Sequence, residues 1–132
     1  MRALVMLAVG LGLGALLTVV AMNSLRKGTA YPNGVMAVMA AQMGQLDRGI
    51  KAGACTAEDL GGHLATLQAL GNDLEPAFLP TADDAQFSRF AGDYRAAVGR
   101  ALAEAPRDCG EAGARLNAIS ATCKACHQQF KG

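Results

Sequence analysis

The stretch Cys123-Lys124-Ala125-Cys126-His127 lies close to the end of a chain of 132 residues, and the rest of the fold must build the pocket that its chemistry requires. Two cysteines three positions apart lie one helical turn apart, so both thiols can form thioethers to one edge of the same porphyrin. The imidazole of the next residue can then ligate the iron. The pattern predicts one covalently attached haem c, with Cys123 and Cys126 as thioether residues and His127 as the proximal iron ligand.

Two other chemistries use paired cysteines. A thioredoxin-type dithiol lies at a strand-to-helix junction, whereas here the pair falls late in a helical segment with no strand-like sequence around it. A structural zinc site needs four ligands. The missing ones could come from Cys55, Cys109 or His63, none of which repeats a zinc-like pair. Haem attachment is the favoured interpretation, with a metal site or a dithiol as alternatives.

The composition favours closely packed helices. The chain is 52% hydrophobic and 5% aromatic, with 16 glycines and no tryptophan, which is unlike a β-sandwich. From residue 28 onward nine Lys and Arg residues face eleven Asp and Glu residues, and neither a basic stripe nor an aromatic platform is present in the sequence. Nucleic-acid binding is therefore not expected. The length suits one domain plus an N-terminal segment.

The N-terminal segment is apolar. Twenty residues without a charge, Ala3 to Met22, follow Arg2. As a helix such a run is about 30 Å long, which spans the hydrocarbon core of a bilayer. We therefore expect residues 1–25 to form a single transmembrane anchor or signal-anchor. A cleaved secretory signal is the alternative, although the run is longer than the roughly 7–15 apolar residues of such signals.

A polar segment follows the apolar run. Residues 26–33 contain Gly28 and Pro32, which predicts a short tether before a haem domain at 34–132. Thioethers to haem form outside the cytoplasm, so the motif places the domain on the outer face. We expect a single-pass protein of the bacterial inner membrane with its haem domain in the periplasm.

Apolar residues recur at helical spacing in four segments after the tether. The first seam consists of Met36, Met39, Met43, Leu46 and Ile50. Thr56 and Asp59 form a capping-box-like start for a second helix, whose inner face consists of Leu60, Leu64, Leu67 and Leu70. Residues 71–80 are predicted as a loop that fills the core with Leu74, Phe78 and Leu79.

Two further helices complete the pattern. Thr81 and Asp84 repeat the capping signal, and the third helix turns inward Phe87, Phe90, Tyr94, Ala97, Val98 and Ala101. The fourth runs from about Glu111 to Lys131, with an inner face of Leu116, Ile119, Cys123, Cys126 and Phe130. Short connections between four amphipathic helices predict an all-α fold, an antiparallel up-down-up-down four-helix bundle with C-terminal haem attachment, preceded by one transmembrane helix.

A globular cytochrome c fold is the alternative, but there the C-x-x-C-H run lies near the N-terminus and the methionine far downstream. That order is reversed here. Antiparallel packing places Met36 and Met39 at the level of His127. It also brings Cys55 near Cys109 at the opposite end, where an oxidising compartment would allow a disulfide.

From about residue 29 to 131 the chain resembles the cytochrome c′ family, the c-type cytochromes built as four-helix bundles with C-x-x-C-H near the C-terminus. The haem motif followed by Phe130 and Lys131 is similar to the family's ending. Tyr31 followed five residues later by Met36 is similar to its first helix. The resemblance implies that Phe130 and Lys131 contribute to cofactor binding.

The resemblance also bears on the distal side of the haem, which the position of Met36 faces in this family. A leucine there leaves the iron five-coordinate and open to NO or CO, whereas a methionine in the low-spin branch ligates the iron. The chain thus resembles the low-spin branch, with Met36 as distal ligand. From the residues alone, ligation by Met39 and an open iron remain alternatives, because a methionine in a bundle seam often only fills the core. Pro32, in place of a basic residue, and the membrane segment depart from the family pattern.

The expected function is that of a membrane-anchored monohaem c-type cytochrome, which carries single electrons on the periplasmic side and transforms no substrate, so it is not an enzyme. Expected partners are a quinol-oxidising complex, a photosynthetic reaction centre or a terminal oxidase, and residence as a subunit of such a complex is a further option. The alternative function is a five-coordinate haem protein that binds NO or CO in an apolar distal pocket.

Overall fold

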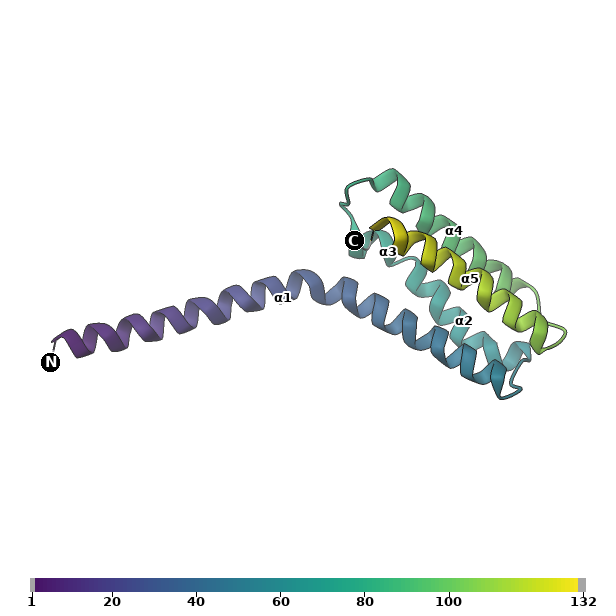
Figure 1. Ribbon diagram of the computed structural model, residues 1–132, viewed down its shortest axis with the longest axis horizontal. Coiled ribbons are helices and arrows are strands. Elements are labelled where there is room, and N and C mark those ends of the chain that lie inside the picture. Colours follow the sequence, from purple (N-terminus) through teal and green to yellow (C-terminus); the bar gives the residue numbers. More distant parts are fainter. Residues whose placement is uncertain (1, 131–132) are drawn as a thin grey trace. The chain divides into compact units, whose positions relative to one another are not determined.

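The computed structural model describes the backbone of residues 2–130, and their side chains except at 3–5, 7–9 and 23–29. This part of the chain is helical, as the composition predicted (Figure 1). Its helices are α1 (Arg2–Lys51), α2 (Ala57–Gly71), α3 (Leu74–Phe78), α4 (Asp84–Ala103) and α5 (Cys109–Phe130).

The chain divides into two compact units, an N-terminal unit of residues 1–33 and a bundle unit of residues 34–132. In the N-terminal unit the side chains described between residues 10 and 22 are mainly apolar and are exposed, among them Leu11 and Leu17. Within the described part of the chain, no helix combines the length and the apolar character needed to cross a membrane. The predicted membrane segment includes side chains at 3–5 and 7–9 that lie outside the described residues.

The tether expected at residues 26–33 lies inside α1, whose helix continues through Pro32. Proline lacks an N–H donor and is unfavourable inside a helix by about 3 kcal/mol. Helix propagation is cooperative, and long helical runs on both sides of Pro32 outweigh this cost. The side chains of residues 26–29 lie outside the described part.

The bundle unit is built from residues 34–51 of α1 together with α2, α4 and α5, which lie side by side (Figure 1). Close backbone contacts join α4 to α5, to α2 and to α3. Each of the four long segments contributes one large, fully buried side chain to the core, namely Leu46, Leu67, Val98 and Ile119. The prediction of an all-helical bundle is confirmed at this level.

Helix starts agree with the sequence signals in part. The Thr56 hydroxyl accepts a hydrogen bond from the Asp59 N–H at 3.2 Å, and the Thr56 N–H donates to the Asp59 carboxylate at 3.0 Å. This capping box opens α2 as predicted. At α4 the cap is Asp83, which accepts from the Gln86 N–H at 2.9 Å. The predicted pair is present, because the Thr81 N–H and hydroxyl both donate to the Asp84 carboxylate, but Thr81 is not the cap residue itself.

A short helix, α3, lies within the segment predicted as a loop. Leu74 is buried and Phe78 half-buried, as expected for core-filling residues, but Leu79 is 37% exposed and does not fill the core. Five residues are too few to show a helical repeat. Pro76 also signals a break, yet it lies in the first helical turn, where its missing N–H removes no helical hydrogen bond.

Cys55 and Cys109 form a disulfide with Cα atoms 5.1 Å apart. The bond joins the turn after α1 to the first residue of α5, so the pairing predicted from antiparallel packing is present. It leaves Cys123 and Cys126 as the free cysteines of the described residues.

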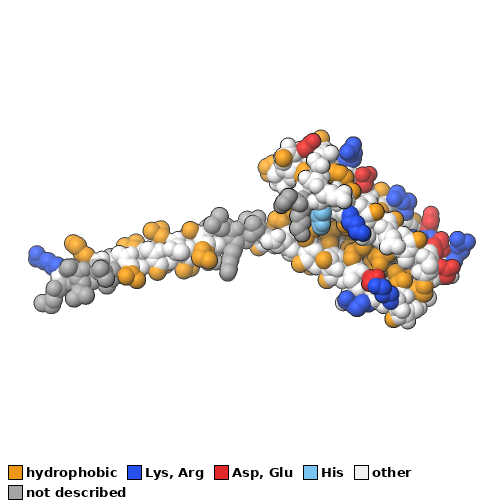
Figure 2. All heavy atoms as spheres, in the orientation of Figure 1, with side chains coloured by type: hydrophobic (Ala, Val, Ile, Leu, Met, Phe, Trp, Pro, Cys, Tyr) orange, Lys and Arg blue, Asp and Glu red, His pale blue; other side chains and the backbone are white. Residues whose placement is uncertain are grey.

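Charged side chains of both signs are interspersed over the visible face of the bundle unit (Figure 2). Among the residues described, this surface shows no large region of one sign, in agreement with the balanced count in the sequence. An extended basic surface of the kind used for nucleic-acid binding is therefore not seen on this face.

Candidate functional site

A cavity of about 450 Å³ lies among α1, α3, α4 and α5. Its size falls within the range of roughly 300–1,000 Å³ that is typical of ligand and cofactor pockets. Its lining is mainly apolar, and His127 is the one lining residue with a side chain that can carry a positive charge among those described. The cavity can therefore take a large apolar group.

The wall formed by α5 carries the haem motif. Cys123, Cys126 and His127 all line the cavity. The two cysteines are half-buried and lie one helical turn apart, while His127 is exposed at its edge. Burial raises the pKa of both thiols, and the neighbouring Cys123 adds to the rise at Cys126. The structure thus brings together the three residues predicted to hold the cofactor.

The wall formed by α1 carries a stripe of three methionines. Met36, Met39 and Met43 recur at steps of three and four residues and line the cavity together. Met39 is 7% exposed, and the other two are half-buried. Both predicted distal ligands therefore share a cavity with His127. Met43, which the sequence placed in the same seam, lines the cavity as well.

Aromatic residues of α4 form a third wall, where Phe87, Phe90 and Tyr94 line the cavity. The Tyr94 hydroxyl donates a hydrogen bond of 3.0 Å to the Leu67 carbonyl, and burial raises the pKa of this phenol, so it stays neutral. Phe130 packs edge-on against Phe87 and Phe90, with ring centroids 5.3 and 6.1 Å apart. Phe130 itself, which was expected to bind the cofactor, is not among the lining residues of the cavity. Lys131, the other residue expected to bind the cofactor, lies outside the described residues.

Several lining residues were not recognised in the sequence as part of a site, among them the aromatic residues of α4, which were expected only to face inward. Leu74 was expected in the core, but its assignment to a loop hid its place in the cavity wall. Ser120 and Thr122 flank the inner face of α5 and line the cavity as well. The Thr122 hydroxyl donates a hydrogen bond of 2.7 Å to the Ile119 carbonyl, so its polar group is already satisfied by the helix.

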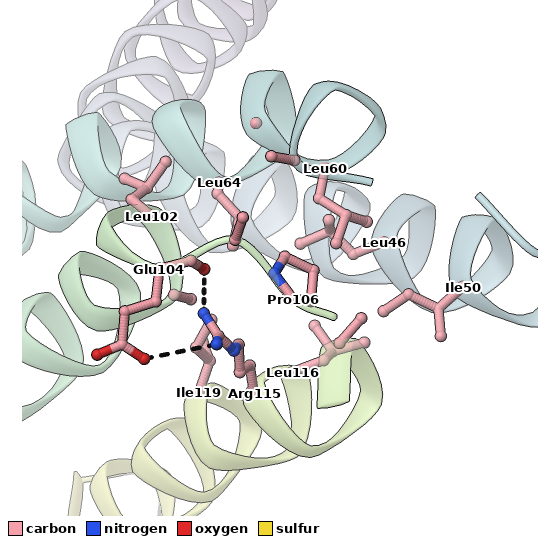
Figure 3. Close-up of a pocket in the computed structure, with 15 residues that line it drawn as sticks. Leu46, Ile50, Leu60, Leu64, Leu102, Glu104, Pro106, Arg115, Leu116 and Ile119 are labelled. Atoms are coloured by element: carbon pink, nitrogen blue, oxygen red, sulfur yellow. Dashed lines mark hydrogen bonds and ion pairs between the residues drawn. The ribbon is translucent and has the colours of Figure 1, made fainter. Parts of the chain in front are cut away.

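A second hollow, of about 40 Å³, lies near the start of α5 and is lined by leucines of all four long segments (Figure 3). Arg115 reaches into it and forms an ion pair of 3.4 Å with the Glu104 carboxylate. The Arg115 guanidinium also donates to the Glu104 carbonyl oxygen. This hollow has room for a few water-sized molecules at most. The large cavity is therefore the candidate site.

The residues that would complete a zinc site are engaged elsewhere. Cys55 and Cys109 form the disulfide, and His63 Nδ1 lies 2.6 Å from the Gln42 side-chain oxygen. Within residues 2–130, no group of three or more His, Cys, Asp or Glu side chains is placed to hold a metal ion. These contacts do not support the zinc alternative.

Comparisons with protein-family models, with curated proteins and with solved structures found no match to this chain. The cavity fits a covalently attached haem. It offers two half-buried free thiols one turn apart, an adjacent imidazole, methionine side chains from α1 and an apolar lining.

Proposed function

We propose that residues 34–132 form a c-type haem domain of the cytochrome c′ kind, an antiparallel up-down-up-down bundle that carries single electrons. The observation that carries this proposal is the shared cavity, which Cys123, Cys126 and His127 line together with the methionines of α1. The three motif residues alone would provide a ligand on only one side of the iron. The shared cavity adds space for the porphyrin and the methionine side chains of α1 as possible second ligands.

Each residue has a defined role in this proposal. Cys123 and Cys126 would hold the porphyrin edge through thioethers, and His127 would supply an imidazole ligand to the iron. Met36 would supply a methionine sulfur ligand, with Met39 as the alternative. When bound, the haem supplies one-electron exchange between ferrous and ferric iron. The apolar lining and the thioether ligand both favour the ferrous state, because they stabilise the less charged iron.

The location and partners are proposed from the sequence. The uncharged run from Ala3 to Met22 is long enough for a membrane anchor, and haem attachment takes place outside the cytoplasm. We propose a bacterial inner-membrane protein with its haem domain in the periplasm. An anchor keeps a carrier at high effective concentration beside a membrane partner. Suitable partners are a quinol-oxidising complex, a photosynthetic reaction centre or a terminal oxidase, and no catalytic activity is proposed.

The first experiment is haem staining of the full-length protein after denaturing electrophoresis, because only a thioether-linked haem survives it. The Cys123→Ala, Cys126→Ala double variant is the matched control and should not stain. Absence of stain from the wild type would refute the proposal.

Optical spectra then test the ligands. A low-spin ferric spectrum with a sulfur-to-iron charge-transfer band is expected for the wild type. That band should disappear in Met36→Ala and persist in Met39→Ala and Met43→Ala. Loss of the band in Met39→Ala alone would move the ligand to that residue.

The alternative function is binding of NO or CO at an iron that no methionine ligates. The apolar lining of the cavity suits these small, uncharged gases. A high-spin wild-type spectrum with rapid CO uptake would support this gas-binding function and refute the electron-carrier function.

A further inference from the structure

A cluster of four residues, which we call the Arg95 clasp, joins the end of α2, α3 and the middle of α4. It consists of Gly71, Glu75, Tyr94 and Arg95. Arg95 Nη1 donates to the Gly71 carbonyl at 3.0 Å and to Glu75 Oε2 at 2.7 Å. Its second terminal nitrogen donates to Glu75 Oε1 at 3.3 Å. One guanidinium therefore holds both the last carbonyl of α2 and the carboxylate of α3.

The ion pair of the clasp is partly shielded from water. The Arg95 and Glu75 side chains are 28% and 27% exposed. The hydrogen bond from Arg95 lowers the pKa of Glu75 below its usual value, so the carboxylate is charged when the clasp is closed. A two-pronged, partly buried pair of this kind is stronger and more directional than an exposed one.

Close packing at Gly71 brings the clasp together. A Cβ at this position would lie 3.0 Å from Arg95 Cγ and 3.1 Å from Tyr94 Cε1. Glycine alone lets the two side chains of α4 approach α2 this closely. Tyr94 adds the hydrogen bond of 3.0 Å from its hydroxyl to the Leu67 carbonyl, one turn earlier on α2.

Two residues connect the clasp to the cavity. Tyr94 is itself a lining residue, and Leu74, which lines the cavity beside it, is the neighbour of Glu75 in the chain. Leu74 is 6% exposed. A helix of five residues is too short to be stable by its own hydrogen bonds. Contacts with α4 must therefore hold α3 and its leucine in place.

We propose that Glu75 and Arg95 are positioning residues for the haem cavity. Their ion pair keeps α3 closed, so that Leu74 excludes water and small external ligands from the side of the cavity that α3 covers. This inference rests on the proposed haem function. The carboxylate of Glu75 and the guanidinium of Arg95 do not line the cavity, yet in this proposal they control access to it.

The test uses the full-length haem protein in detergent and two measurements. The first is the apparent rate of CO uptake by the ferrous form, with the reference protein and every variant made in a Met36→Ala background so that loss of the Met36 ligand does not limit the rate. The second is hydrogen–deuterium exchange of the α3 amides, which does not depend on haem. Glu75→Gln should raise both rates about fivefold or more, the range that follows from losing a charge-assisted hydrogen bond. Leu74→Ala should raise CO uptake without breaking the clasp.

Glu111→Gln is the matched control. Like Glu75, Glu111 forms ion pairs with arginine, in its case with Arg107 and Arg115. It lies at the start of α5, among residues that do not line the large cavity. Both rates should stay within about twofold of the reference protein in this variant. Arg95→Lys keeps the charge but offers a single ammonium in place of the fork, so its CO uptake should lie between those of the reference protein and Glu75→Gln.

Three results would overturn the inference. One is an unchanged exchange rate of α3 in both Glu75→Gln and Arg95→Lys. Another is an unchanged CO uptake in variants whose α3 does exchange faster. The third is an equal rise in the Glu111→Gln control, which would indicate general destabilisation. If the chain carries no haem, the proposed function fails, and the exchange measurement on α3 still decides whether the clasp holds this helix closed.

Discussion

Replacing Cys55 and Cys109 together by alanine is expected to lower the free energy of unfolding by about 4 kcal/mol at 25 °C. The two residues are 54 positions apart, so their bond closes a loop of this length in the unfolded chain. The entropy of the unfolded chain that the bond removes grows with the logarithm of the loop length, and this loop corresponds to about 4 kcal/mol. The ratio of folded to unfolded protein should then fall about a thousandfold.

Urea denaturation of the full-length protein, followed by circular dichroism, measures this loss. The double variant and the wild type under reducing conditions should unfold at the same lower midpoint. The dependence on urea should steepen in both, because an unfolded chain without the cross-link exposes more surface. Neither cysteine lines the large cavity, so the optical spectrum of the proposed haem should stay unchanged.

Two outcomes would contradict this reasoning. A loss below about 1 kcal/mol would show that loop closure in the unfolded chain is not the main contribution of the bond. A change of the spectrum of the proposed haem before unfolding would show that the disulfide and the cavity are coupled. We expect no such coupling, because they lie in different parts of the bundle. A single Cys55→Ala variant would leave a reactive thiol on Cys109, so the double variant is the sound comparison.

Three further predictions concern the core, an ion pair and the clasp. Leu67→Ala should cost about 2–5 kcal/mol in urea denaturation, because Leu67 is 0% exposed, whereas Leu102→Ala at 39% should cost under about 1 kcal/mol. Hydrogen bonds from Arg107 lower the pKa of Glu111 to about 2, so its stabilising effect is present above pH 4.5 and lost as the pH falls toward 2. Thermal midpoints of Glu111→Gln should therefore vary less than the wild type's over this range. Gly71→Ala should speed exchange of the α3 amides, as measured by mass spectrometry.

Local signals in the sequence accounted for most of the bundle. The capping box at Thr56 depends on residues three positions apart. The burial of Leu46 and Ile119 depends on an apolar repeat within one helix. The disulfide followed from the predicted antiparallel order, in which the first and third turns would lie at one end of the bundle. Such features need no knowledge of how far apart the helices lie.

Features that depend on competition between segments were predicted less well. The tether predicted around Pro32 and part of the loop predicted at residues 71–80 are both helical. Cooperative helix extension makes Pro32 tolerable, and Pro76 lies in a first helical turn, where proline removes no hydrogen bond. The cap of α4 moved from Thr81 to Asp83 because two acidic residues and a threonine compete for the same turn. Propensity alone does not rank such neighbours.

The candidate site divides along the same line. The placement of Cys123, Cys126 and His127 on one wall of the cavity was predictable because the three lie within five consecutive residues of one helix. The facing wall was not, since a periodic seam indicates which side of α1 faces inward but not whether it meets another helix or a cavity. Met36, Met39 and Met43 would each be ordinary core residues if α1 packed directly on α5. A cavity of about 450 Å³ separates the two walls, so these three seam positions line an open space instead of packing against another helix.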